Sequence, residues 1–183
     1  MQFILIDRIL ELEPGRRILA VKNLTLAEEY LAEHFPGFPV LPGVLMLEAG
    51  AQAAAWLVRI TENYQHSVIV LKSVRTVKYG NFVSPGRQLL LEAQIVRQTD
   101  RETEFRLKGT VDGLSAVSGR ITMERYNLRD RDPALEGLDR EIVGALKSRY
   151  PLLMRKDVRP AEPLAASPAP ADPMVAVDQV VAR

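Results

Sequence analysis

The chain has 183 residues, enough for one domain with a substantial core and a further segment. Lys and Arg number 24 and Asp and Glu 23, so the net charge of +1 favours neither nucleic acid nor an acidic membrane surface as a partner. Cysteine is absent, which excludes a disulfide framework, a thiolate nucleophile and a cysteine-ligated metal. The first residues lack the basic start and the apolar length of a signal peptide, so we expect a cytoplasmic protein.

The N-terminal part predicts short elements separated by turns. Residues 1–12 are largely apolar and fit either a short helix or an extended entry. Residues 13–15 (Glu-Pro-Gly) are typical of a turn, and residues 17–26 read as a strand. Residues 27–41 are expected to be irregular, because prolines do not fit a helix interior.

A long buried helix is predicted next. Pro42 suits a first helical position, and residues 44–60 are rich in Ala and Leu, with strong helix propensity. This segment is apolar around nearly its whole circumference, which is typical of a buried helix. The prolines before it, together with Glu48 and Gln52 within it, argue against a membrane span.

Four strand-like segments follow the helix: residues 67–79, 88–98, 102–111 and 115–125. The last two alternate between apolar and polar side chains, the period of a half-buried antiparallel strand. Asp112-Gly113 between them is a two-residue hairpin turn. Such strands need a buried face and the helix needs a cover, so we predict an α+β fold in which a curved antiparallel sheet wraps a central helix.

The residues after 125 differ in composition from those before them, which suggests that the chain has three parts. We predict a main domain over 1–125, an extension over 126–158 and a flexible Pro- and Ala-rich tail over 159–183. The extension is expected to contain an amphipathic helix with Asp132 as its cap. Its apolar face would comprise Leu135, Leu138, Ile142 and Leu146.

The candidate functional residues are His34 and Glu48. Glu48 is the single charged residue between Phe35 and Val58, and His34 lies just before this apolar run. A histidine and a carboxylate in apolar surroundings are suited to acid–base chemistry, because burial and mutual proximity separate the proton affinities of such groups.

The run from His34 to Gln52 closely resembles the motif of the β-hydroxyacyl-[acyl carrier protein] dehydratases of FabZ type. It reads His-Phe-Pro-Gly-Phe-Pro-Val-Leu-Pro-Gly-Val-Leu-Met-Leu-Glu-Ala-Gly-Ala-Gln. Residues 5–17 and 83–86 also resemble that family, and the resemblance covers roughly residues 3–125. It implies a hotdog fold and a homodimer, with a trimer of dimers as the larger alternative. It also implies active sites between subunits, each taking the histidine from one chain and the glutamate from the other.

The resemblance also implies a role for each matched residue. His34 corresponds to the catalytic base, Glu48 to the catalytic acid and the Gly43 N–H to an oxyanion donor. Gln52, one helical turn after Glu48, would orient the carboxylate. The expected reaction is dehydration of a (3R)-hydroxyacyl-[acyl carrier protein] to its trans-2-enoyl form in fatty acid or related lipid synthesis, without metal or cofactor.

Substrate and carrier contacts are further expectations. Tyr30, Leu31, Phe82 and Val83 are candidates for the acyl tunnel. Lys72, Arg75, Lys78 and Arg87 are candidates for receiving the acidic face of an acyl carrier protein. The chain departs from the family pattern at Glu33, where glycine is usual, and at Ser73, where aspartate is usual.

Two other functions are compatible with the same pattern. One is a hotdog thioesterase, in which a carboxylate activates water at the thioester carbonyl. The other is a non-catalytic acyl-binding or scaffold protein that keeps the fold. Product analysis separates the three, because dehydration forms an enoyl thioester, hydrolysis releases a free thiol, and a scaffold binds without chemistry.

Overall fold

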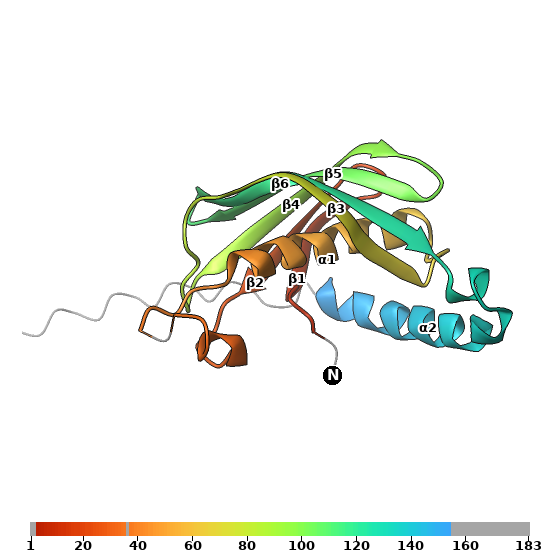
Figure 1. Ribbon diagram of the computed structural model, residues 1–183, viewed down its shortest axis with the longest axis horizontal. Coiled ribbons are helices and arrows are strands. Elements are labelled where there is room, and N and C mark those ends of the chain that lie inside the picture. Colours follow the sequence, from red (N-terminus) through yellow and green to blue (C-terminus); the bar gives the residue numbers. More distant parts are fainter. Residues whose placement is uncertain (1–2, 36, 155–183) are drawn as a thin grey trace, which may run out of the picture.

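The computed structural model describes residues 3–35 and 37–154, and its main body is a curved antiparallel sheet around one long helix (Figure 1). The six strands are β1 (Arg8–Glu13), β2 (Arg17–Asn23), β3 (Val68–Tyr79), β4 (Gln88–Gln98), β5 (Glu102–Val111) and β6 (Leu114–Tyr126). The helices are α1 (Gly43–Thr61) and α2 (Glu136–Leu153), with the short 3-10 helices η1 (Glu29–Leu31), η2 (Leu128–Asp130) and η3 (Pro133–Leu135). The strand order is β1-β2-β4-β5-β6-β3, so β1 and β3 form the two edges.

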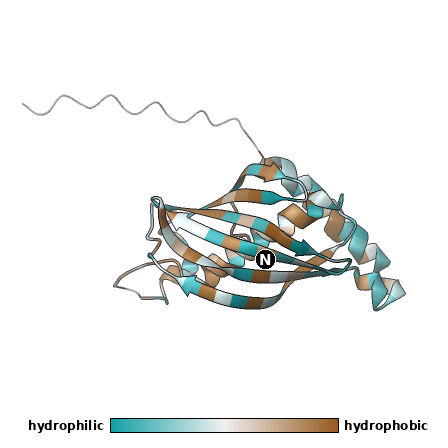
Figure 2. Ribbon diagram, turned by 90° about the horizontal axis from the view of Figure 1, so that it is seen from above, coloured by the Kyte–Doolittle hydropathy of each residue, from teal (hydrophilic) through white to brown (hydrophobic). Residues whose placement is uncertain are grey.

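The predicted alternation is present along the strands (Figure 2). In β5 every second side chain is buried, from Thr103 to Val111, whereas the residues between them are half-buried or exposed. Asp112 and Gly113 join β5 to β6 with φ angles of 50° and 80°, as a type I′ hairpin turn requires. The predicted helix wrapped by a curved antiparallel sheet is therefore confirmed.

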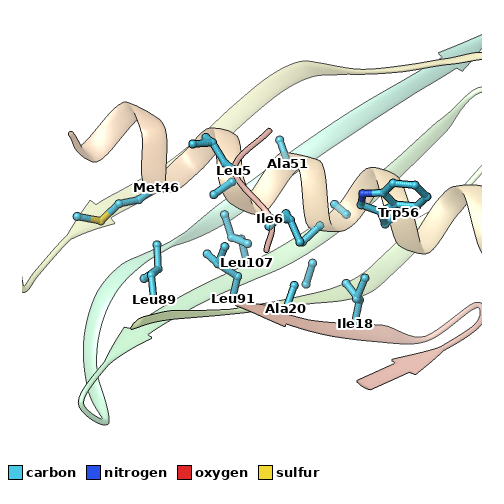
Figure 3. Packing of buried hydrophobic residues seen from close by; sticks show 14 of the residues in the cluster. Leu5, Ile6, Ile18, Ala20, Met46, Ala51, Trp56, Leu89, Leu91 and Leu107 are labelled. Carbon is cyan, nitrogen blue, oxygen red and sulfur yellow. The ribbon is translucent and has the colours of Figure 1, made fainter. Parts of the chain in front are cut away.

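α1 lies in the concave face of the sheet (Figure 1), and its buried side chains contribute to the apolar core of the described residues (Figure 3). Its length and composition would suit a membrane span, but most of it is buried within the protein. At Gly50 the helix and sheet approach so closely that a Cβ would lie 2.5 Å from Leu107 Cδ2. The absence of a side chain at Gly50 therefore lets α1 pack directly against Leu107 of β5.

The two ends of the described chain settle details that the sequence left open or placed differently. Residues 8–13 form the edge strand β1, the extended one of the two alternatives, because the turn at residues 14–16 returns the chain to pair with β2. The C-terminal helix is present, but it begins at Glu136 because Asp132 caps η3 instead. It continues to Leu153, past the predicted apolar face, with Pro151 in its last turn.

α2 is attached to the main body through the buried carboxylate of Asp139. This carboxylate accepts hydrogen bonds from Ser67 Oγ and from the backbone N–H groups of Leu128 (2.9 Å) and Arg129 (3.0 Å). The attachment joins α2 to the start of β3 and to η2. The predicted tail at 159–183 lies outside the described residues, and the three-part division of the chain stays a prediction.

Candidate active site

Glu48 lies in the second turn of α1 and borders a cavity of about 440 Å³. Gln52 Nε2 donates a hydrogen bond to Glu48 Oε1 (2.9 Å) and another to the Phe3 carbonyl (3.1 Å). Gln52 Oε1 accepts from the Leu5 N–H (2.9 Å), which fixes the orientation of the amide. One carboxylate oxygen of Glu48 is therefore held toward Gln52.

His34 lies in the loop between η1 and α1 and is partly buried. Its backbone N–H donates to the Tyr30 carbonyl (3.2 Å), and its ring centroid lies 4.4 Å from that of Phe35. Phe35 adopts a φ of 52°, a left-handed conformation that is uncommon for a residue other than glycine. Within residues 3–35 and 37–154 of one chain, no hydrogen bond or ion pair joins His34 to Glu48.

The loop that carries His34 is fixed to the loop before β4. The Leu41 N–H donates to the Val83 carbonyl (2.8 Å), and the rings of Phe38 and Phe82 meet edge to face at 5.5 Å. Phe38 and Leu41 shortly precede α1, and Phe82 and Val83 shortly precede β4. The two contacts hold the segment between His34 and the N-terminus of α1 against the loop before β4.

Gly43 is the first residue of α1, where a backbone N–H has no acceptor within the helix. A Cβ at this position would lie 3.0 Å from the Tyr79 ring, so glycine allows that ring to cover the helix N-terminus. The first N–H groups of a helix favour negative charge. The position suits an oxyanion donor, and that role stays a prediction.

The four candidate tunnel residues do not border the cavity that contains Glu48. Leu31 and Val83 are buried in the core, and Phe82 is exposed beside Phe38. Tyr30 is partly buried against Phe3, and burial, with the nearby negative charge of Glu28, raises the pKa of its hydroxyl. Their proposed role stays a prediction.

Two of the four candidate docking cations have a carboxylate partner, and two do not. Lys72 forms an ion pair with Glu102 (2.6 Å), and Arg87 forms one with Asp112 (3.1 Å). Arg75 and Lys78 are exposed on edge strand β3. In the part of the chain that the structure describes, neither has a carboxylate partner, so their charges are available to an acidic surface.

The cavity also contains residues that the sequence interpretation did not assign to a site. α1 contributes Trp56 and Arg59, and α2 contributes Ile142, Leu146 and Arg149. Trp56 and Arg59 follow Glu48 by 8 and 11 positions, a spacing that returns to one face of a helix, so helical periodicity would have identified them. Among the described residues, no three His, Asp or Glu side chains converge as a metal site.

The model of the FabA-like domain matches residues 1–120. The chain belongs to the FabA-like family. Curated relatives within this FabA-like group include the 3-hydroxyacyl-[acyl-carrier-protein] dehydratase FabZ of Thiobacillus denitrificans, 45% identical over 132 residues, covering 70% of this chain and 89% of the relative. The FabZ of Ruminiclostridium cellulolyticum is 40% identical over 119 residues, covering 65% and 84%. The FabZ-type resemblance is thus confirmed.

Solved structures agree with the hotdog fold of this FabA-like chain. The dehydratase heterocomplex ApeI:P from Xenorhabdus doucetiae matches with a TM-score of 0.59 and 17% identity, covering 73% of this chain and 90% of that one. A Streptococcus mutans protein, smu.793, bound to acetyl-CoA matches with a TM-score of 0.53 and 14% identity, covering 69% and 94%. At these identities the two structures support the fold alone.

Proposed function

We propose that this FabZ-type dehydratase removes water from (3R)-hydroxyacyl-[acyl carrier protein] and forms the trans-2-enoyl thioester. The observation that carries the proposal is the pairing of Glu48 with Gln52 at the edge of a cavity, in a chain 45% identical to a FabZ dehydratase. A carboxyl group held beside a cavity is suited to give a proton to a departing hydroxyl.

In this proposal His34 removes a proton from C2 of the substrate, and the electrons of that C–H bond form the C2–C3 double bond. The C3–O bond breaks, and Glu48 gives its proton to the departing oxygen, so that water leaves. The Gly43 N–H donates to the thioester oxygen while negative charge develops there. His34 then carries one proton more and Glu48 one fewer. Transfer of that proton from His34 to Glu48 restores the starting state.

The test uses the full chain and a (3R)-hydroxyacyl thioester whose enoyl product is followed by its ultraviolet absorbance. We expect His34→Ala and Glu48→Gln each to lower kcat by at least ~10²–10⁴-fold, the usual contribution of one acid–base group. Wild-type activity in either variant would contradict the assignment. Release of free thiol without enoyl formation would instead support the thioesterase alternative, and tight binding of the acyl carrier without turnover would support a scaffold.

The proposal includes a homodimer in which His34 of one chain serves Glu48 of the other. It is supported by large exposed apolar side chains near the N-terminus of α1, among them Val44 (68% exposed) and Phe82 (64% exposed). It is also supported by β3, an edge strand whose outer side has no strand partner within the described residues. A second copy would cover these apolar side chains and pair with the backbone edge of β3.

A mixing experiment tests the shared site. Dimers that contain one His34→Ala chain and one Glu48→Gln chain hold one intact site and one doubly altered site. Random mixing of the two inactive proteins should therefore restore roughly a quarter of the wild-type sites. If each chain supplied both residues to its own site, mixing would restore no activity.

A further inference from the structure

The cavity beside Glu48 extends along one face of α1 toward Arg59. The two residues are 11 positions apart, which is about 16 Å along a helix axis. Between them the lining is mainly apolar, with Ala51, Ala55 and Trp56 from α1 and Ile69, Leu71 and Met123 from the sheet. A long apolar cavity that starts at the proposed acid has the shape and chemistry to hold an alkyl chain.

α2 forms one wall of this cavity. Ile142, Ala145 and Leu146 line it, and the ring of Tyr150 lies 6.0 Å from that of Trp56. α2 begins at Glu136, beyond the residues that match the FabA-like domain. The wall is therefore contributed by a part of the chain outside the family match.

Arg59 is a cation at the end of the cavity away from Glu48. Within the described part of the chain none of its N–H groups has a hydrogen-bond acceptor, and its guanidinium lies 5.5 Å from the centre of the Trp56 ring. Burial lowers the pKa of Arg59 to about 10; the nearby Tyr64 raises this pKa and the charge of Arg149 lowers it, so Arg59 remains protonated at neutral pH. A desolvated cation of this kind is usually paired with an anion.

We propose that this cavity holds the acyl chain of the substrate and that Arg59, with Arg149, binds a carboxylate at the far end of that chain. The inference rests on the proposed dehydratase function and names its substrate class: 3-hydroxyacyl thioesters with a carboxyl-terminated chain. The phosphate of a pantetheine arm is an alternative anion. An apolar lining fits an alkyl segment better, because it gives no hydrogen bonds to the amides of the arm.

The experiment compares 3-hydroxyacyl thioesters of equal carbon number that end in a methyl group or in a carboxylate. Each is supplied both on acyl carrier protein and as an N-acetylcysteamine thioester, which has no phosphate. We expect the wild-type chain to favour the carboxylate-ended substrate in kcat/KM by about tenfold to a hundredfold, as for a charge-assisted hydrogen bond. The preference should be present on both carriers.

Three variants of the full chain test the role of Arg59. Arg59→Met should reduce the ratio of the two kcat/KM values to near one, whereas Arg59→Lys, which keeps the charge, should retain part of the preference. Arg106→Met, on the exposed face of β5, is the matched control and should leave the ratio unchanged. Because the readout is a ratio of two substrates in one preparation, partial unfolding of a variant does not mimic the effect.

Several results would overturn the inference. One is a wild-type preference for the methyl-ended chain. Another is a loss of kcat/KM in Arg59→Met that is equal for both chain types and is seen with the carrier-bound substrate alone. That result would assign Arg59 to the pantetheine phosphate. Dehydration of methyl-ended chains alone would contradict this inference and leave the proposed function intact, whereas no dehydration of any substrate would contradict the proposed function.

Discussion

The side-chain amide of Gln52 links Glu48 to the N-terminal segment, donating to Glu48 Oε1 at 2.9 Å and accepting from the Leu5 N–H at 2.9 Å. The amide cannot rotate without losing the bond to Leu5. The segment before β1 thus restricts the position of the proposed catalytic acid.

Replacing Gln52 with methionine keeps the volume of the side chain and removes its hydrogen bonds. We expect kcat to fall by about tenfold to a hundredfold, because the hydrogen bond stabilises the negative charge that Glu48 gains as it gives up its proton, and such a bond contributes about 1.5–3 kcal/mol. KM should change less than about twofold. Thr61→Val is the matched control, since Thr61 Oγ1 also connects α1 to the N-terminal chain, by accepting from Gly15 N–H away from the cavity. An equal loss of kcat in both variants would show that Gln52 is merely structural.

The close approach at Gly50 predicts a loss of stability in Gly50→Ala. The added methyl group would meet Leu107, which is 1% exposed and has little room to move. We expect a loss of about 1–3 kcal/mol in the free energy of unfolding, measured by thermal or denaturant unfolding. Gly144→Ala in α2 meets nothing within 4 Å and should instead gain about 0.5–1 kcal/mol. Equal stability of the two variants would contradict the interpretation.

The Asp139 carboxylate predicts how stability depends on pH. Burial raises its pKa, but hydrogen bonds from Ser67, the Arg129 N–H and the Leu128 N–H outweigh burial and hold the pKa below its usual value of 3.8. A lowered folded-state pKa stabilises the protein above the unfolded-state pKa, and this contribution is lost as the pH falls through the folded-state value.

Asp139→Asn tests that pH dependence. At neutral pH we expect it to lower the free energy of unfolding by about 1–3 kcal/mol, because buried donors lose a charged acceptor. In urea titrations the difference from wild type should be constant above about pH 5 and should narrow toward about pH 3. A difference that does not change with pH would exclude a stabilising role for the ionised form.

Arg75 and Lys78 test the docking of a carrier protein. Replacing both with alanine should raise KM roughly two- to fivefold for each charge when the substrate is carrier-bound, and the effect should weaken at high salt. KM for the N-acetylcysteamine thioester should not change. Lys72→Ala is the matched control, because Lys72 is already paired with Glu102. Equal effects on both substrates would argue against docking at this strand.

The elements that were predicted well are those whose local pattern and tertiary environment agree. The strands at residues 88–98 and 102–111 have the predicted bounds, and the turn at Asp112-Gly113 is as expected, because alternation and turn chemistry are local properties. For the edge strand β1 the sequence fits either a helix or an extended segment. Its conformation depends on pairing with β2, which a short apolar stretch does not encode.

In the candidate site, too, local features were predicted and features that depend on tertiary packing were not. The Glu48–Gln52 pair was predicted because a spacing of four residues is local to one helix. The contribution of α2 to the cavity was not predicted, because it depends on how α1, which ends at Thr61, packs against α2, which begins at Glu136. Arg59 was overlooked although its position on the face of Glu48 follows from helical periodicity.

The wall and the proposed acid–base pair belong to separate stretches of the chain. α2 follows the last strand and is attached through Asp139, whereas His34 and Glu48 lie before β3, 102 and 88 positions ahead of Glu136. If the two proposals hold, changes in α2 would alter the range of accepted acyl chains while the proposed base and acid, His34 and Glu48, keep their positions. A helix placed after the family domain would thus let selectivity change separately from the reaction itself.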